Sequence, residues 1–89
     1  MTVFSVTYDL NKDKDYEKLW AELEKFNGHK AALSFFFVDV NTNEPHVLLD
    51  HLNNYIDDDD RLVVSRVDVR PATQRAFKGT KDWLDRRFP

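Results

Sequence analysis

Three observations predict that this 89-residue chain folds as an α+β protein, with two helices on one face of an antiparallel sheet. Strand-like runs rich in Val, Phe, Thr and Tyr occupy residues 3–10, 30–40 and 61–70. Helix-like runs at 15–26 and 45–56 separate them, with apolar residues at three- and four-residue steps. The chain has only two glycines and no linker-like segment, so these elements belong to a single domain.

The composition is that of a folded protein, with 42% hydrophobic and 13% aromatic residues in a chain near the lower size limit for an independent core. The absence of cysteine excludes both a disulfide framework and a thiolate metal site. No stretch approaches the ~20 apolar residues of a membrane span, and none resembles a signal peptide. We therefore expect a soluble, cytoplasmic protein that has no membrane partner.

The charges are unevenly distributed along the chain. Residues 1–60 carry five Lys/Arg and 13 Asp/Glu, a net charge of −8, whereas residues 61–89 carry eight Lys/Arg and three Asp/Glu, a net charge of +5. A basic third of this kind can meet phosphates. Accidental clustering on an ordinary solvated surface is an equally good interpretation.

The first strand-like run, Val3 to Leu10, carries the carboxylate Asp9 near its carboxyl end. A polar segment follows at once, so Asp9 is expected at the border between the sheet and a loop. A carboxylate there can act as a ligand, or it can simply cap the following loop. The residues alone leave this choice open.

The run at 30–40 is too long and continuous for one simple edge strand, and Ser34 near its middle predicts a kink or a tight switch between two strands. The three consecutive phenylalanines must point to alternating sides, with Phe36 on one face and Phe35 and Phe37 on the other. Both faces of the sheet are then apolar at this point. Because two helices in so small a domain cover one face only, we expect the other face to meet a partner.

Asp57 to Asp60 are four consecutive carboxylates, which suggests a divalent-cation site. They lack the alternate spacing, the glycine and the terminal Glu of a calcium loop, so a solvated turn is the favoured interpretation. His46 and His51 are not at the i, i+4 spacing that lets two histidines share a zinc ion, and His29 beside a glycine is typical of a loop.

The order of elements is strand, helix, two strand segments, helix and strand, which is the ferredoxin-like βαββαβ arrangement. We assign residues 1–70 to this unit and residues 71–89 to a C-terminal docking tail of the same single domain. In the tail, apolar residues such as Phe77 and Trp83 provide contacts for docking, and Gly79 is expected to interrupt the helix.

Three stretches resemble the CRISPR-associated Cas-two (Cas2) family and its relatives, the VapD toxin ribonucleases. Val6-Thr7-Tyr8-Asp9-Leu10 is similar to the family's first strand, which ends in an aspartate after Tyr. Leu33-Ser34-Phe35-Phe36 is similar to its Ser-Val-Phe kink, and residues 55–64 resemble the acidic turn that leads into its fourth strand. The order and separation of the three stretches also agree over about residues 3–67.

This resemblance implies a homodimer in which two copies of Asp9 approach each other. In family members that are nucleases, this aspartate holds a divalent metal, so the resemblance implies an endonuclease that acts on RNA or DNA with Mg²⁺ or Mn²⁺ at Asp9. Such ions prefer oxygen ligands and activate water. Ser34 would lie nearby as a positioning hydroxyl. One aspartate per chain is too few for a full site, so dimerisation would be required.

Two other functions are alternatives to the nuclease. The first is a non-catalytic dimer that binds nucleic acid or holds duplex DNA as a scaffold, with an integrase or an antitoxin as a partner protein. Arg66 and Arg70 are then the candidate phosphate contacts, and salt bridges to the acidic part of the chain are the alternative role for both. The second is a protein-interaction module that shares the fold alone. The tail around Trp83 does not resemble the usual short fifth strand of the family.

Overall fold

The computed structural model describes the backbone of residues 1–89 and all side chains except those of Asp13 and Lys14. The elements, in chain order, are β1 (Thr2–Asp9), α1 (Asp13–Glu24), β2 (His29–Ala32), β3 (Phe35–Val40), α2 (Pro45–Leu52), the 3₁₀ turn η1 (Asn53–Tyr55), β4 (Arg61–Arg66) and α3 (Thr80–Arg87). Within the described residues, no helix is both long and apolar enough to cross a membrane.

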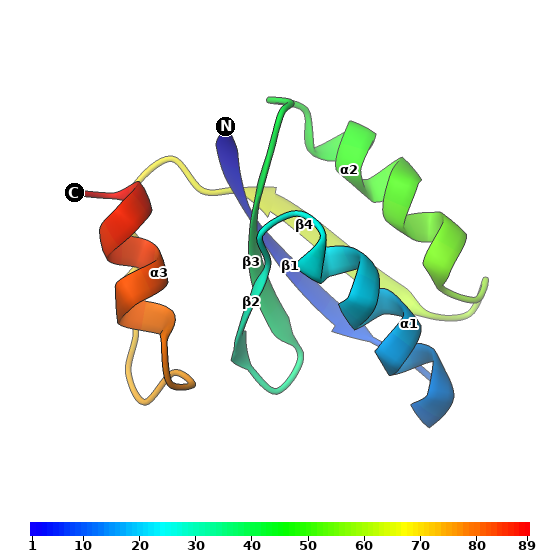
Figure 1. The fold of residues 1–89 in the computed structure, drawn as a ribbon. Coiled ribbons are helices and arrows are strands. Elements are labelled where there is room, and N and C mark those ends of the chain that lie inside the picture. Colours follow the sequence, from blue (N-terminus) through cyan, green and yellow to red (C-terminus); the bar gives the residue numbers. More distant parts are fainter.

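The four strands form one antiparallel sheet in the order β2-β3-β1-β4, with α1 and α2 on one side and α3 on the other (Figure 1). Strand β1 lies in the middle, with Val6 opposite Phe36 of β3 and Val64 of β4. The order β1, α1, β2, β3, α2 and β4, with only the short turn η1 between the last two, is therefore the ferredoxin-like order that the sequence predicts. We call the side covered by α1 and α2 the first face of the sheet, and the opposite side the second face.

The first face carries the main core of the molecule. Alternate residues of β1 are buried there, because successive side chains of a strand point to opposite faces. The helices contribute the apolar side that their sequence periodicity predicts. The buried members of this core are Phe4, Val6, Tyr8, Leu10, Leu19, Leu23, Phe36, Val38, Leu48 and Leu52.

Strands β2 and β3 form a tight hairpin through Leu33 and Ser34, so the predicted switch between two strand segments is confirmed. Phe36 lies in the first-face core, whereas Phe35 and Phe37 belong to the cluster on the second face, as their alternation predicts. The turn before β2 depends on Gly28. A Cβ atom on this residue would lie 2.4 Å from the carbonyl oxygen of Leu23, so only glycine fits there.

Helix α3 covers part of the second face, which the sequence analysis assigned to a partner. Trp83 and Leu84 of α3 are buried against Val3, Ala31 and Phe37. The Trp83 ring stacks on the Phe37 ring, with 5.7 Å between their centroids, and its Nε1 donates a hydrogen bond of 2.8 Å to the carbonyl oxygen of Asn27. The prediction was wrong for this part of the face, because the tail of the same chain provides the cover.

A buried ion pair fixes the end of α3. Arg87 Nε lies 2.5 Å from Oδ2 of Asp39, and the other oxygen of that carboxylate, Oδ1, accepts a hydrogen bond from the Asn27 side chain. The guanidinium group of Arg87 lies over the Trp83 ring, 3.7 Å from its centroid. Polar and apolar contacts therefore hold the tail together, as expected for a docked segment rather than a loose terminus.

The last strand is shorter than the sequence predicts, because β4 ends at Arg66 and not at Arg70. Arg66 pairs with Phe4 of β1, and the Val67 N–H still donates to the Val3 carbonyl. Beyond this point β1 has almost no residues left to pair with, so the chain leaves the sheet despite its strand-like alternation. Residues 67–79 then cross to the other edge, where the Phe77 N–H donates to the Ala31 carbonyl.

A groove of about 660 Å³ remains on the second face between the sheet and residues 67–79. Its walls are mostly apolar and include Ala31, Leu33, Phe35, Val67, Ala72 and Phe77. Leu33 is 76% exposed and Phe77 is 45% exposed. Helix α3 therefore leaves an apolar part of this face open to solvent.

A second correction concerns His29, which begins β2 and does not lie in a loop. Its Nε2 atom is 2.7 Å from the hydroxyl of Thr80, the first residue of α3. The Thr80 hydroxyl itself donates to the Phe77 carbonyl, so the ring nitrogen acts as the donor to Thr80. Gly79, with φ of +95°, stands directly before α3, and the predicted interruption of the helix there is confirmed.

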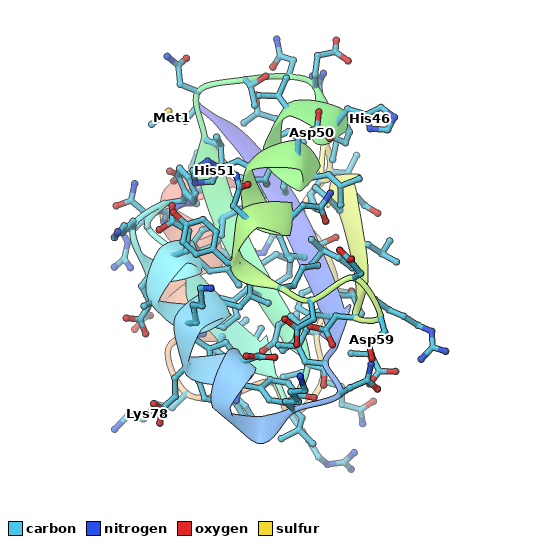
Figure 2. All side chains as sticks on the ribbon, turned by 90° about the vertical axis from the view of Figure 1, so that its right-hand side faces the viewer. Met1, His46, Asp50, His51, Asp59 and Lys78 are labelled. Carbon is cyan, nitrogen blue, oxygen red and sulfur yellow. The ribbon has the colours of Figure 1, made fainter. Side chains whose placement is uncertain are left out.

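His51 connects the two helices of the first face. Its ring, labelled in Figure 2, places Nε2 2.5 Å from Oε2 of the buried Glu22 on α1. Lys25 lies 3.2 Å from the other oxygen of that carboxylate. The hydrogen bond from His51, assisted by Lys25, lowers the pKa of Glu22. The structure thus gives His51 a structural role as a contact between α1 and α2.

Candidate functional site at the carboxyl end of β1

Asp9 is the last residue of β1, and its side chain lies on the second face with those of Ser5 and Thr7. The β1–β4 register places it opposite Arg61, the first residue of β4. Asp9 Oδ2 accepts a hydrogen bond of 3.2 Å from Nη1 of Arg61. The two side chains are 68% and 78% exposed, so Asp9 is an accessible carboxylate with a cation beside it.

Ser34 lies near the same end of β1. Its carbonyl oxygen accepts a hydrogen bond of 3.2 Å from the backbone N–H of Tyr8, the residue before Asp9. The fold therefore brings Ser34 next to the strand that carries Asp9, as the sequence analysis expects. Among the described side chains no hydrogen bond joins the Ser34 hydroxyl to Asp9, so the two groups are neighbours rather than a bonded pair.

A cluster of carboxylates lies beside this site. One oxygen from each of Asp15, Asp57 and Asp60 lies within 4.8 Å of the others. Asp60 accepts hydrogen bonds from the backbone N–H groups of Asn11, at 2.9 Å, and Asp57, at 2.8 Å. Asp59, at the turn before β4, is shown in Figure 2. Two of the four consecutive aspartates therefore turn inward, whereas Asp58 and Asp59 fit the predicted solvated turn.

Asp15 is the unusual member of this cluster. Its Oδ2 atom is buried and has no hydrogen-bond partner among the described residues. Burial of the group raises the pKa of Asp15, and so does a hydrogen bond to Asp57, which needs a proton between the two carboxyls. Lys12, whose Nζ lies 3.4 Å from Asp57, opposes this effect. The sequence analysis missed Asp15, because only the packing of α1 brings it to the acidic turn.

Comparison with known proteins identifies the family. A model of the family described as CRISPR associated protein Cas2 matches residues 1–75. The chain belongs to the Cas2 family. The resemblance to the Cas2 family is thereby confirmed. Helix α3 lies outside the matched residues.

A solved structure supports the fold of this Cas2 family chain. It is the crystal structure of a hypothetical protein, TT1823, from Thermus thermophilus, with a TM-score of 0.69 and 22% sequence identity. The match covers 82% of this chain and 89% of that chain. At this identity the likeness shows the fold alone.

The single Cas2 chain does not provide enough ligands for the metal expected at Asp9. A hard divalent cation needs several oxygen ligands, and Asp9 offers one carboxylate. The only group of three or more candidate ligands among the described residues is the one at Asp15, and Asp9 does not belong to it. The guanidinium group of Arg61 also occupies the place beside Asp9 Oδ2. A metal at Asp9 would require a second chain and a displaced Arg61.

The two arginines predicted to contact phosphate are both engaged in ion pairs. Arg66 Nε lies 2.6 Å from Asp68, and Arg70 lies 2.7 Å from Asp85 and donates to the Phe88 carbonyl. Both therefore fit the salt-bridge alternative in the isolated chain. Their partners come from the basic third of the sequence and not from its acidic part.

Three other cations are better placed to meet a phosphate. Arg75, Lys78 and Arg86 are exposed and make no ion pair with any side chain that the structure describes. Residues 75 and 78 lie in the segment before α3, and residue 86 lies in its last turn. The sequence analysis did not single them out. The signal that could have found them is the lack of acidic residues between 69 and 81.

Proposed function

We propose that this Cas2 family chain is a homodimeric nucleic-acid-binding protein that holds RNA or duplex DNA by its phosphates. The observation that supports this function best is the set of three exposed cations, Arg75, Lys78 and Arg86, which no described carboxylate neutralises. Phosphate contacts from Lys and Arg supply most of the sequence-independent affinity for nucleic acid. Membership of the Cas2 family, and its scaffold role implied by the resemblance, agree with this proposal.

The second copy would dock on the second face. The open groove beside Phe35 and the exposed Leu33 provide apolar surface there, and Asp9 lies on the same face. Helix α3 restricts this interface, because it already covers Phe37. Light scattering after gel filtration tests the dimer, and Leu33→Asp should shift it toward the monomer. A variant that stays fully dimeric would place the interface elsewhere.

Binding is tested by fluorescence anisotropy with a labelled 20-base-pair DNA and an RNA of equal length, over a range of salt concentrations. The logarithm of affinity should fall linearly with the logarithm of salt, with a slope of about −0.9 per phosphate contact. Substituting Gln for Arg75, Lys78 and Arg86 together should flatten that slope by about 2–3. The matched control is Arg66→Gln, which removes a cation that is already paired.

A metal-dependent endonuclease is the second candidate, favoured by the exposure of Asp9 at the position that matches the family's metal-binding aspartate. Cleavage of RNA or DNA should then require Mg²⁺ or Mn²⁺ and disappear in Asp9→Ala. Asp50→Ala, at an exposed position of α2, is the control for a lost carboxylate. Equal rates for wild type and Asp9→Ala would reject this candidate and leave the binding function in place.

A further inference from the structure

The groove on the second face combines an apolar interior with a basic charge. Aliphatic residues such as Ala31, Val67, Pro71 and Ala72 form much of its lining. Arg75 is the only charged residue among the described residues that line it, and none of these is acidic. A ligand that complements the groove must therefore present apolar surface with an anionic group beside it.

Two further cations lie next to the groove. Lys78 directly follows the lining residue Phe77, is exposed and forms no ion pair with the side chains that the structure describes. Lys30 Nζ lies 5.8 Å from the centroid of the Phe77 ring and 4.1 Å from that of Trp20. Because Arg75 and Lys78 have no ion-pair partner among the described residues, their charge is available to an anionic ligand.

The backbone holds Arg75 in an uncommon conformation. Its φ of +55° lies in the left-handed region, which residues other than glycine, asparagine and aspartate seldom adopt. Residues kept in such conformations cluster at ligand-binding positions. The observation agrees with a binding role for the guanidinium group, because glycine would form the turn itself with less strain.

The ring contacts and the exposed rim favour a peptide over a nucleobase or a small amphiphile. The Phe37 ring stacks on Trp83 and meets the Phe35 ring edge to face, so these contacts occupy the surface on which a base would stack. At the rim, Leu33 is 76% exposed and Phe77 is 45% exposed, and a small molecule inside the groove would leave both uncovered. A peptide lying along the groove would insert aliphatic side chains and cover the rim as well.

We propose that the groove binds a peptide segment of a partner protein in which Leu, Ile or Val residues stand beside Asp or Glu. The aliphatic side chains would lie between the sheet and residues 71–77, and the carboxylates would pair with Arg75 and Lys78. This inference goes beyond nucleic-acid binding but shares Leu33 and the two cations with the proposed function. A bound peptide would therefore compete with the second copy and with nucleic acid.

The test selects binders to the whole protein from a phage-displayed library of random short peptides. Enriched peptides should carry aliphatic residues beside acidic ones. The affinity of one enriched peptide is then measured by fluorescence anisotropy without nucleic acid. Arg75→Gln combined with Lys78→Gln should weaken its binding about five- to twentyfold, because two exposed charge contacts are lost.

The matched control is Arg61→Gln combined with Arg66→Gln, which removes the same charge from β4. Neither residue lines the groove, so the affinity should stay within about twofold of wild type. Ala72→Glu places a carboxylate at an exposed position of the lining and should weaken binding by at least about tenfold through like-charge repulsion. Circular dichroism checks that each variant is folded.

Equal affinity of wild type and Ala72→Glu, or no enrichment of aliphatic and acidic peptides, would overturn the inference. If Ala72→Glu instead lost binding of oligothymidylate, or lost the dimer, with no peptide bound by wild type, the groove would belong to nucleic acid or to the second copy. The proposed function fails separately, if wild type binds no nucleic acid. That failure would leave the peptide measurement unchanged, because no nucleic acid is present in it.

Discussion

On the first face of the sheet, α1 and α2 cover alternate side chains of β1, β3 and β4, whereas on the second face the cover ends part-way across. Helix α3 and residues 67–79 lie over the apolar side chains of β2, β3 and the start of β1. The opposite part carries the exposed residues Thr7, Asp9, Arg61, Val63 and Ser65. The first face therefore provides stability, and the bare part of the second face is available to ligands.

The two faces also use charge differently. On the first face the buried carboxylate of Glu22 is held between His51 and Lys25 at the junction of the helices. On the second face, Arg87 of α3 and Asp39 of β3 form an ion pair that is largely shielded from solvent. Asp9 and Arg61 form an ion pair that is exposed to solvent. Shielded pairs fix the structure, because an unpaired buried charge is costly, and exposed pairs can be exchanged for other partners.

The largest effect should come from the first face. Phe4 is fully buried in its core, so Phe4→Ala should lower the free energy of unfolding by about 3–5 kcal/mol through lost burial and the cavity left behind. Because domains of this size have little stability in reserve, the variant should be largely unfolded at 37 °C. Urea denaturation followed by circular dichroism measures the change. A loss below about 1 kcal/mol would contradict the assignment of this face as the main core.

Removal of a buried aromatic side chain should destabilise the protein less on the second face than on the first. Trp83→Ala should cost about 2–3 kcal/mol, less than is usual for a buried tryptophan, because α3 can detach while the sheet stays folded. Hydrogen exchange with mass spectrometry should show lost protection in residues 80–87 and retained protection in β1. Lys81→Gln, at an exposed position of α3, is the control. Equal loss of protection in β1 would show that the two faces unfold as one unit.

Acid should loosen the attachment of α3 before it affects the first face. Burial lowers the pKa of His29, so the unfolded chain binds a proton more readily and stability falls as the pH drops below about 6.5. Glu22 differs from His29 because the folded state favours its charged form, which lowers its pKa. Its contribution to stability is therefore lost only as the pH falls below about 4.5. His29→Gln should flatten the curve of unfolding free energy between pH 7 and 5.5. Parallel curves for the two proteins would refute this role of His29.

The smallest effect on stability is expected at the bare part of the second face. Asp9→Asn removes an exposed ion pair, which should change the free energy of unfolding by less than about 1 kcal/mol. The same variant is expected to have large effects on metal binding, if Asp9 is a ligand. Thermal unfolding monitored by calorimetry provides the stability value. A loss of several kcal/mol would indicate that Asp9 is a structural residue.

Much of the first face could be predicted from local patterns. The alternation of Phe35, Phe36 and Phe37 fixes which ring points to which side, because the period of a strand is two. The helical periodicity of residues such as Leu19 and Leu23 identifies the side that packs on the sheet. The position of Asp9 at the end of the first strand follows from the same reading. The family resemblance then marked Asp9 as the residue to test.

The candidate site was only partly predictable, because its contacts join residues about 50 positions apart. The Asp9–Arg61 pair could have been expected from one signal, since an antiparallel alignment of the first and last strands puts the end of one beside the start of the other. The meeting of Asp15 with Asp57 and Asp60 had no such signal. It depends on how the first turn of α1 packs beside the turn before β4.

The sequence by itself determined the order of the strands and helices, the first-face core and the place of Asp9, because these depend on local periodicity and burial. Tertiary structure alone decided that β4 stops at Arg66, since β1 offers no further partner. It also decided that α3 covers Phe37, that Asp9 meets Arg61 and that Arg75, Lys78 and Arg86 form no ion pair with the side chains that the structure describes. Such outcomes depend on which distant segments compete for the same surface, and no local pattern records that competition.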